Sequence, residues 1–177
     1  MSERETIDKV KDRQGILSKI QNFFTLGYGT KEDLREFDRK LRDLYYAELR
    51  DMRHVWEDAY LAALNAGLKG SSRDFKKVIQ VLDRVMEKVR HADYGYAGLM
   101  DRKGHIREEE LAGVFNYDRT LGNDVETMKK AVDKTYSETE AENWTNVPAE
   151  VKNIKGLLLA FENKWHDREK QFRPLEI

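Results

Sequence analysis

The stretch from Lys31 to Ala66, KEDLREFDRKLRDLYYAELRDMRHVWEDAYLAALNA, decides the fold. Thr30 offers a capping hydroxyl directly before it, and Glu32 and Asp33 place negative charge in the first turn, where the helix dipole favours it. The apolar residues recur at steps of three and four, which stacks them on one face of a helix. They are Leu34, Phe37, Leu41, Leu44, Tyr45, Leu49, Met52, Val55, Trp56, Ala59, Tyr60 and Ala63. We therefore predict a single helix, about 50 Å long.

Helices are also expected on both sides of this long one. Residues 7–24 carry an apolar stripe that stops at Gly27, which predicts a preceding helix. Residues 75–89 carry another stripe, and Ser72 is expected to cap that helix. Residues 93–104 break the pattern and predict an irregular connection. Short turns between long helices favour antiparallel neighbours.

The second half of the chain predicts three more helices. The first covers residues 106–121 and is expected to end at Gly122, and the second begins with Asp124 as its N-cap. A loop is expected over residues 137–150, and a last helix over residues 148–173, because Pro148 suits a first helical turn.

The expected fold class is therefore all-α: an antiparallel helical bundle of five to six helices with one very long helix, in one domain spanning residues 1–177. No β alternation competes with this interpretation, and the spacing is typical of bundles and coiled coils. Hydrophobic residues make up 40% and charged residues 37%, which suits a packed core under a highly charged surface.

Charge and cysteine content narrow the function classes. Lys plus Arg number 32 against 33 Asp plus Glu, so the net positive charge that drives nucleic-acid binding is missing. The chain has no cysteine, which excludes disulfides, thiolate zinc sites and thiol catalysis. No apolar run approaches the roughly 20 residues needed to span a bilayer, and the charged N-terminal segment does not resemble a secretory signal. We expect a cytoplasmic protein without a membrane segment.

Glu48 is the most informative single residue. It falls within the apolar arc of the long helix, between Leu44 and Met52, where a buried charge must be paired or neutralised. One interpretation is a metal ligand or proton donor inside a bundle. The favoured interpretation is an ion pair with Lys or Arg on a facing helix, or plain exposure.

A rival enzyme hypothesis uses inward carboxylates on facing helices. Glu48 would be joined by Glu162 and His166 from the last helix, as candidate metal ligands or catalytic groups. The paired Glu-x-x-His motifs of di-metal bundles are not intact, and Glu162 and His166, four residues apart, are expected to form an ordinary surface pair. No nucleotide, hydrolase or calcium motif is present, and no cofactor is expected.

Two further features could bind ligands. A basic stripe lies opposite the apolar face of the helix over residues 75–89, and could meet phosphate or an acidic partner. Its residues are Arg73, Lys77, Arg84, Lys88 and His91. Tyr94, Tyr96, Met100 and His105 gather around the glycines of the 93–104 connection and form a candidate ligand loop. The alternatives are a solvated helix face and aromatic packing over the bundle end.

The favoured function is a helical scaffold or protein–protein interaction module that self-associates. Tyr46 and Leu61 are expected on the outer face of the long helix, where exposed apolar side chains supply an interface. A helix of that length also needs an equally long neighbour. We expect a homodimer, or binding of a helical protein partner, through residues 31–66. Nucleic-acid binding through the basic stripe ranks third.

Overall fold

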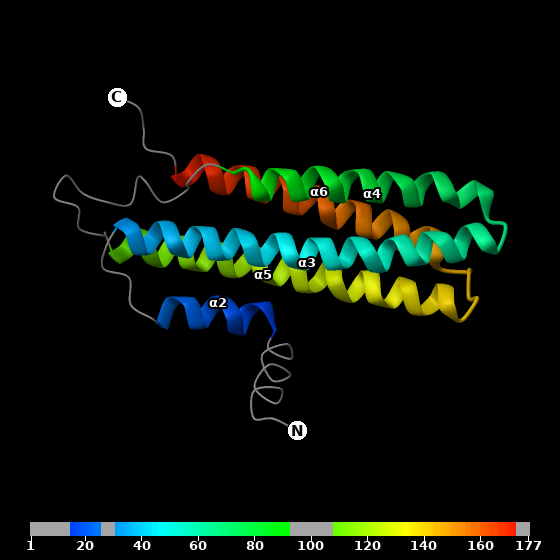
Figure 1. Cartoon of the computed structure of the whole chain (residues 1–177), viewed down its shortest axis with the longest axis horizontal. Helices are drawn as coiled ribbons and strands as arrows, with labels where there is room; N and C mark the ends of the chain where they lie inside the picture. Colours follow the sequence, from blue (N-terminus) through cyan, green and yellow to red (C-terminus); the bar gives the residue numbers. More distant parts are fainter. Residues whose placement is uncertain (1–14, 26–30, 93–107, 173–177) are drawn as a thin grey trace, which may run out of the picture.

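The protein is a bundle of parallel and antiparallel helices in the computed structural model, which describes residues 15–25, 31–92 and 108–172 (Figure 1). The helices are α2 (Ile16–Thr25), α3 (Lys31–Asn65), α4 (Lys69–Arg90), α5 (Glu108–Glu140) and α6 (Val147–Phe172). These described ranges contain no strand, so the all-α prediction is confirmed. The long helix was predicted to within one residue at its end.

The four long helices form a closed ring. α3 packs along α4 and α5, and α6 packs along the same two helices from the other side. Helices joined by short turns, α3 with α4 and α5 with α6, run antiparallel, whereas α3 and α5 run in the same direction, as do α4 and α6 (Figure 1). α2 lies outside the ring against α5 and the edge of α3. The predicted antiparallel arrangement therefore holds only for the consecutive pairs.

One hydrophobic core runs through the ring. The buried residues of each long helix recur about every seven positions, as in Tyr45, Met52 and Ala59 of α3, because that spacing keeps one face inward. Trp56 stacks on Phe75 at 4.8 Å between ring centroids and joins α3 to the start of α4. Trp56 Nε1 also donates to the Phe75 carbonyl oxygen at 3.1 Å.

Most of the described apolar stripe of α3 is buried within one chain, and Leu44, Val55 and Tyr60 are partly buried. α5, with 33 residues, is nearly as long as the 35 residues of α3 and runs beside it. Phe37 near one end and Ala63 near the other are 1% and 0% exposed. The long helix was expected to need an equally long neighbour or a second chain, and α5 of the same chain is that neighbour.

The predicted break at Gly122 was wrong. α5 continues from Glu108 to Glu140, and Asp124, expected as an N-cap, instead pairs with Lys164 of α6 at 2.7 Å. A glycine inside a helix costs only about 1 kcal/mol relative to alanine. Burial of Leu121 and Val125 on either side of it offsets that cost.

Two other boundaries also differ from the prediction. α4 begins at Lys69, three residues before the expected cap at Ser72, and its N-cap Leu68 makes no side-chain capping bond. The Ser71 and Ser72 amides donate to the Leu68 carbonyl oxygen, which closes the first turn without a polar cap. The loop expected over residues 137–150 shrinks to 141–146, because α5 continues to Glu140.

Some predictions fall outside the described residues. Tyr94, Tyr96, Met100 and His105 of the candidate ligand loop belong to these, as does the first half of the helix expected over residues 7–24. The side chain of Leu34 is not described either. Among the described helices, none combines the length and apolar character needed to cross a membrane.

Candidate functional site

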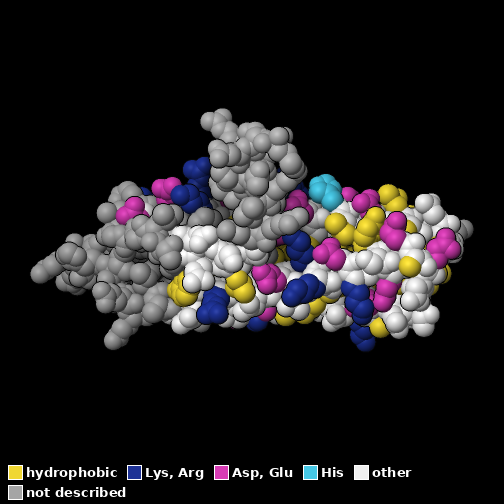
Figure 2. All heavy atoms as spheres, turned by 90° about the horizontal axis from the view of Figure 1, so that it is seen from below, with side chains coloured by type: hydrophobic (Ala, Val, Ile, Leu, Met, Phe, Trp, Pro, Cys, Tyr) yellow, Lys and Arg dark blue, Asp and Glu magenta, His cyan; other side chains and the backbone are white. Residues whose placement is uncertain are grey.

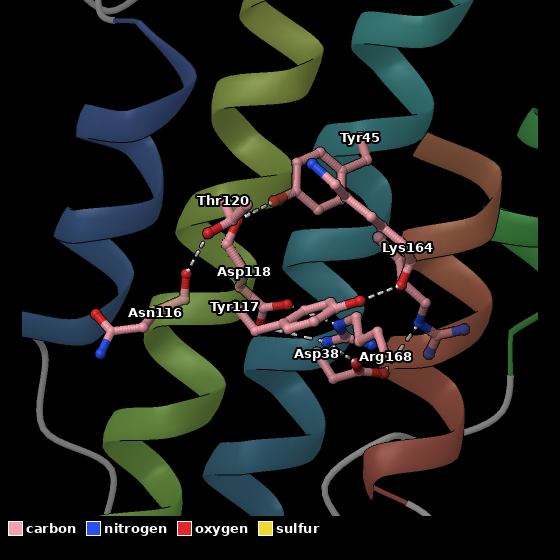
Figure 3. Close-up of polar contacts among 9 residues, drawn as sticks. Asp38, Tyr45, Asn116, Tyr117, Asp118, Thr120, Lys164 and Arg168 are labelled. Atoms are coloured by element: carbon pink, nitrogen blue, oxygen red, sulfur yellow. Dashed lines mark hydrogen bonds and ion pairs between the residues drawn. The ribbon is translucent and has the colours of Figure 1, made fainter. Parts of the chain in front are cut away.

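A buried cluster of charges joins three helices near one end of the bundle. Arg168 reaches from α6 between Asp118 of α5 and Asp38 of α3 (Figure 3). Its Nε lies 2.6 Å from Asp118 Oδ1, and its Nη2 lies 2.9 Å from Asp38 Oδ1. All three side chains are 0% exposed. This is the most deeply buried polar group of the described chain, and the sequence analysis did not identify it.

Two neighbours on α3, Arg42 and Tyr45, add contacts to the cluster. Arg42, one turn after Asp38, places its Nε 3.0 Å from Asp38 Oδ2 and donates from Nη1 to the carbonyl oxygen of Ala92, just beyond α4. The Tyr45 hydroxyl donates to the Asp118 carbonyl oxygen at 2.7 Å. Burial raises the pKa of Tyr45 well above its ordinary value, so the phenol stays a neutral donor.

The chemistry of this cluster is that of a structural clamp. Asp38 and Asp118 are balanced by Arg42 and Arg168, so the formal charges cancel. Arg168 also lies over the Trp165 ring at 5.0 Å, which adds a cation–π contact. The carboxylates are 0% exposed, so no substrate reaches them while the bundle is closed. We therefore expect this group to help fix helix register.

Glu48 forms a second, smaller cluster at the middle of α3. It is buried, with Lys129 Nζ of α5 2.9 Å from one carboxylate oxygen and Lys19 Nζ of α2 3.6 Å from the other. The hydrogen bond from Lys129 to Glu48 raises the pKa of that lysine. The sequence analysis favoured either an ion pair with Lys or Arg on a facing helix or plain exposure of Glu48. The structure has the ion pair, with Lys129 of α5.

Glu162 is not the surface partner of His166 that its spacing suggested. It is 8% exposed, and its carboxylate accepts hydrogen bonds from Arg84 at 2.7 and 2.9 Å and pairs with Lys88 at 2.6 Å, both on α4. The hydrogen bonds from Arg84 lower the pKa of Glu162. His166 is exposed. The prediction failed because it considered one helix alone, while α4 lies beside α6.

The site expected from the enzyme hypothesis, with Glu48, Glu162 and His166 together, is not formed in the structure. Glu48 and Glu162 are bound by different cations on different helices. Within the described part of the chain, no group of three or more His, Asp or Glu side chains is placed to hold a metal ion.

The basic stripe on α4 is largely paired with acidic residues. Arg84 and Lys88 bind Glu162, Lys77 lies 3.0 Å from Asp74, and His91 lies 3.1 Å from Glu87. Arg73 is exposed. Figure 2 shows the side of the bundle away from α4, where Lys and Arg side chains also lie among Asp and Glu side chains. Because these basic groups are paired with carboxylates, the stripe does not form the strongly positive surface that binds nucleic acid.

An open apolar groove lies between α3 and α4 near their turn. Its volume is about 600 Å³, and it is lined by Glu57, Asp58, Tyr60, Leu61, Lys76, Ile79 and Gln80. Tyr60 packs on Phe75, and that ring stacks on Trp56, so the floor of the groove belongs to the core. Arg53, which pairs with Glu57 and with Asp83 of α4, ties the two helices together beside it.

Two large hydrophobic side chains are exposed on α3: Leu61, which lines this groove, and Leu64, three residues further along the helix. They are 53% and 38% exposed, and no other large hydrophobic side chain of the described residues is exposed. Tyr46, the other predicted interface residue, is half-buried, because α4 lies beside it and Arg90 covers its ring at 5.3 Å. Of the two predicted interface residues, Leu61 alone lies on open surface.

No protein-family model, characterised protein or solved structure matches this chain. The function therefore has to be inferred from the geometry of these sites.

Proposed function

We propose that this protein is a helical scaffold and protein–protein interaction module that self-associates through the groove between α3 and α4. Leu61 carries the proposal, because it is 53% exposed and lines a groove with an apolar floor. Leu64, 38% exposed, stands three residues further along α3 and adds to the apolar surface of that helix. Exposed apolar side chains beside a preformed groove are typical of interfaces. The proposal includes a cytoplasmic location, which suits a chain without cysteine.

The rigidity of the groove supports a binding role. Stacked aromatic rings fix its floor, and the ion pairs of Arg53 fix α3 against α4. A surface that is already ordered loses little conformational entropy when a partner docks. The buried clamp around Arg168 has the same effect on the bundle as a whole, since it locks helix register at the other end.

A second copy of this chain is the partner that the charges favour. The α3 side of the groove carries the carboxylate of Asp58, and the α4 side carries the ammonium group of Lys76. In a two-fold dimer whose axis runs along the groove, the acidic α3 side of one copy faces the basic α4 side of the other. The groove is thus electrostatically complementary to its own copy.

Light scattering tests the proposal. The wild type should show a mass near twice the 20.8 kDa of one chain at micromolar concentration, and Leu61→Glu should restore the monomer because it buries an unpaired charge in the interface. Ala160→Glu, which adds the same carboxylate to an exposed position on α6, is the matched control and should leave the dimer intact. A wild type that remains monomeric would refute the proposal.

A further inference from the structure

The position of α2 differs from that of the other helices. The four long helices close their ring without it, and α2 lies on the outer face formed by α5 and the edge of α3 (Figure 1). It has 10 residues, fewer than an isolated helix needs to be stable in water. The helical state of α2 therefore depends on the surface against which it lies.

Three described contacts hold α2 on that surface. The Ile20 side chain is 1% exposed, and Lys19 Nζ lies 3.6 Å from Glu48 Oε1. Gly15, directly before the helix, lies so close to Glu126 of α5 that a Cβ on it would be 2.7 Å from Glu126 Oε1. That carboxylate thus lies at the N-terminal end of α2, where the helix dipole favours negative charge.

The receiving surface is also held by contacts that do not involve α2. Glu48 lies 2.9 Å from Lys129 Nζ, so α5 helps to position the carboxylate that attracts Lys19. The face thus offers an apolar site for Ile20 between two carboxylates, Glu48 and Glu126, which match the ammonium group of Lys19 and the positive end of the helix.

We infer that this face of α3 and α5, centred on Glu48, is a docking surface for a short amphipathic helix, and that in a dimer it receives the α2 helix of another copy. An α2 helix from a second chain would make the same contacts through Ile20, Lys19 and Gly15, and exchange of an identical element between copies requires no new interface. This surface is separate from the α3–α4 groove around Leu61, so the inference does not rest on the proposed function.

Cross-linking of single-cysteine variants tests the exchange in the full-length chain, which has no native cysteine. Gly15→Cys and Glu126→Cys place thiols at two positions that touch, and a short bifunctional thiol reagent joins them. The double variant at low concentration should be joined within one chain. A mixture of the two single variants at high concentration should form a covalent dimer linked between positions 15 and 126, identified by peptide mass.

The matched control mixes Gly15→Cys with Ala160→Cys, an exposed position on α6. We expect several-fold more dimer from the 15–126 mixture than from this control, a loss of that excess when a free peptide of residues 15–25 is added, and an undiminished excess in a Leu61→Glu background. Equal yields from the two mixtures would overturn the inference, as would a double variant that is not joined within one chain. An excess that disappears with Leu61→Glu would also overturn it, because the α3–α4 groove would then explain the cross-link.

Discussion

Arg168 on α6 holds Asp38 on α3 and Asp118 on α5 within 2.9 Å and 2.6 Å of its guanidinium nitrogens, in a site from which solvent is excluded (Figure 3). The three residues come from helices that are far apart in the sequence. We therefore expect the cluster to help specify which helices meet and how they are aligned along the bundle axis.

Removing the arginine should strongly destabilise the bundle. Arg168→Met leaves two buried carboxylates without the guanidinium group that joins them, and breaking a buried pair in this way costs about 3–5 kcal/mol. Urea unfolding followed by circular dichroism measures the change. Arg39→Met, at a surface arginine 79% exposed and 3.9 Å from Asp43, is the control and should cost less than about 0.5 kcal/mol.

Replacing the fully buried triad should give the opposite result. With Asp38→Leu, Asp118→Leu and Arg168→Met combined, the three fully buried charges are removed together, and Arg42, which loses Asp38 as its partner, is 21% exposed and can reach solvent. The free energy of unfolding should return to the wild-type value or exceed it by about 1–4 kcal/mol. A triple variant as unstable as Arg168→Met would mean that the cluster contributes net stability rather than helix register.

Glu48→Ala should destabilise the protein by about 1–2 kcal/mol, because Lys129 and Lys19 lose their common acceptor. Glu36→Ala, which breaks an exposed pair with Lys40, should have an effect below about 0.5 kcal/mol. Thermal unfolding of both variants makes the comparison. Equal losses of stability in the two variants would show that the burial of Glu48 does not strengthen its ion pairs.

The ion pairs of Glu162 should make stability depend on acid pH. Its pKa is lowered in the folded state, chiefly by the hydrogen bonds from Arg84, so the folded state favours the charged carboxylate. Its contribution is then complete above the pKa of the unfolded chain, near ~4.3 for an ordinary glutamate, and is lost as pH falls through the lower folded pKa.

Wild type and Glu162→Gln should therefore differ in stability at about pH 7 and converge as pH falls from about 5 to about 3. Urea unfolding at each pH measures the difference. Glu140→Gln, at an exposed position at the end of α5, controls for the general effect of acid. A gap between wild type and Glu162→Gln that stays constant across this range would contradict the assignment.

Periodicity along single helices predicted the helical fold because burial of an apolar stripe leaves a local pattern. It failed where neighbours decide the outcome. Gly122 continues α5 because flanking side chains are buried, and Glu162 faces α4 rather than its own helix. The Arg168 cluster had a usable signal, since Asp38 stands seven residues before Tyr45 and Arg168 seven after Phe161, at core positions of the repeat.

Charge reversal across the α3–α4 groove tests whether the dimer is two-fold. Asp58→Lys and Lys76→Asp should each weaken self-association, because each leaves like charges facing one another at two symmetry-related places. With about 0.5–1 kcal/mol for each exposed contact, the dissociation constant should rise roughly tenfold. Mixing the two variants should restore association, since the lysine introduced into one chain then faces the aspartate introduced into the other. Analytical ultracentrifugation of each variant and of the mixture gives the three values, and a mixture no tighter than its components would exclude a two-fold contact between Asp58 and Lys76.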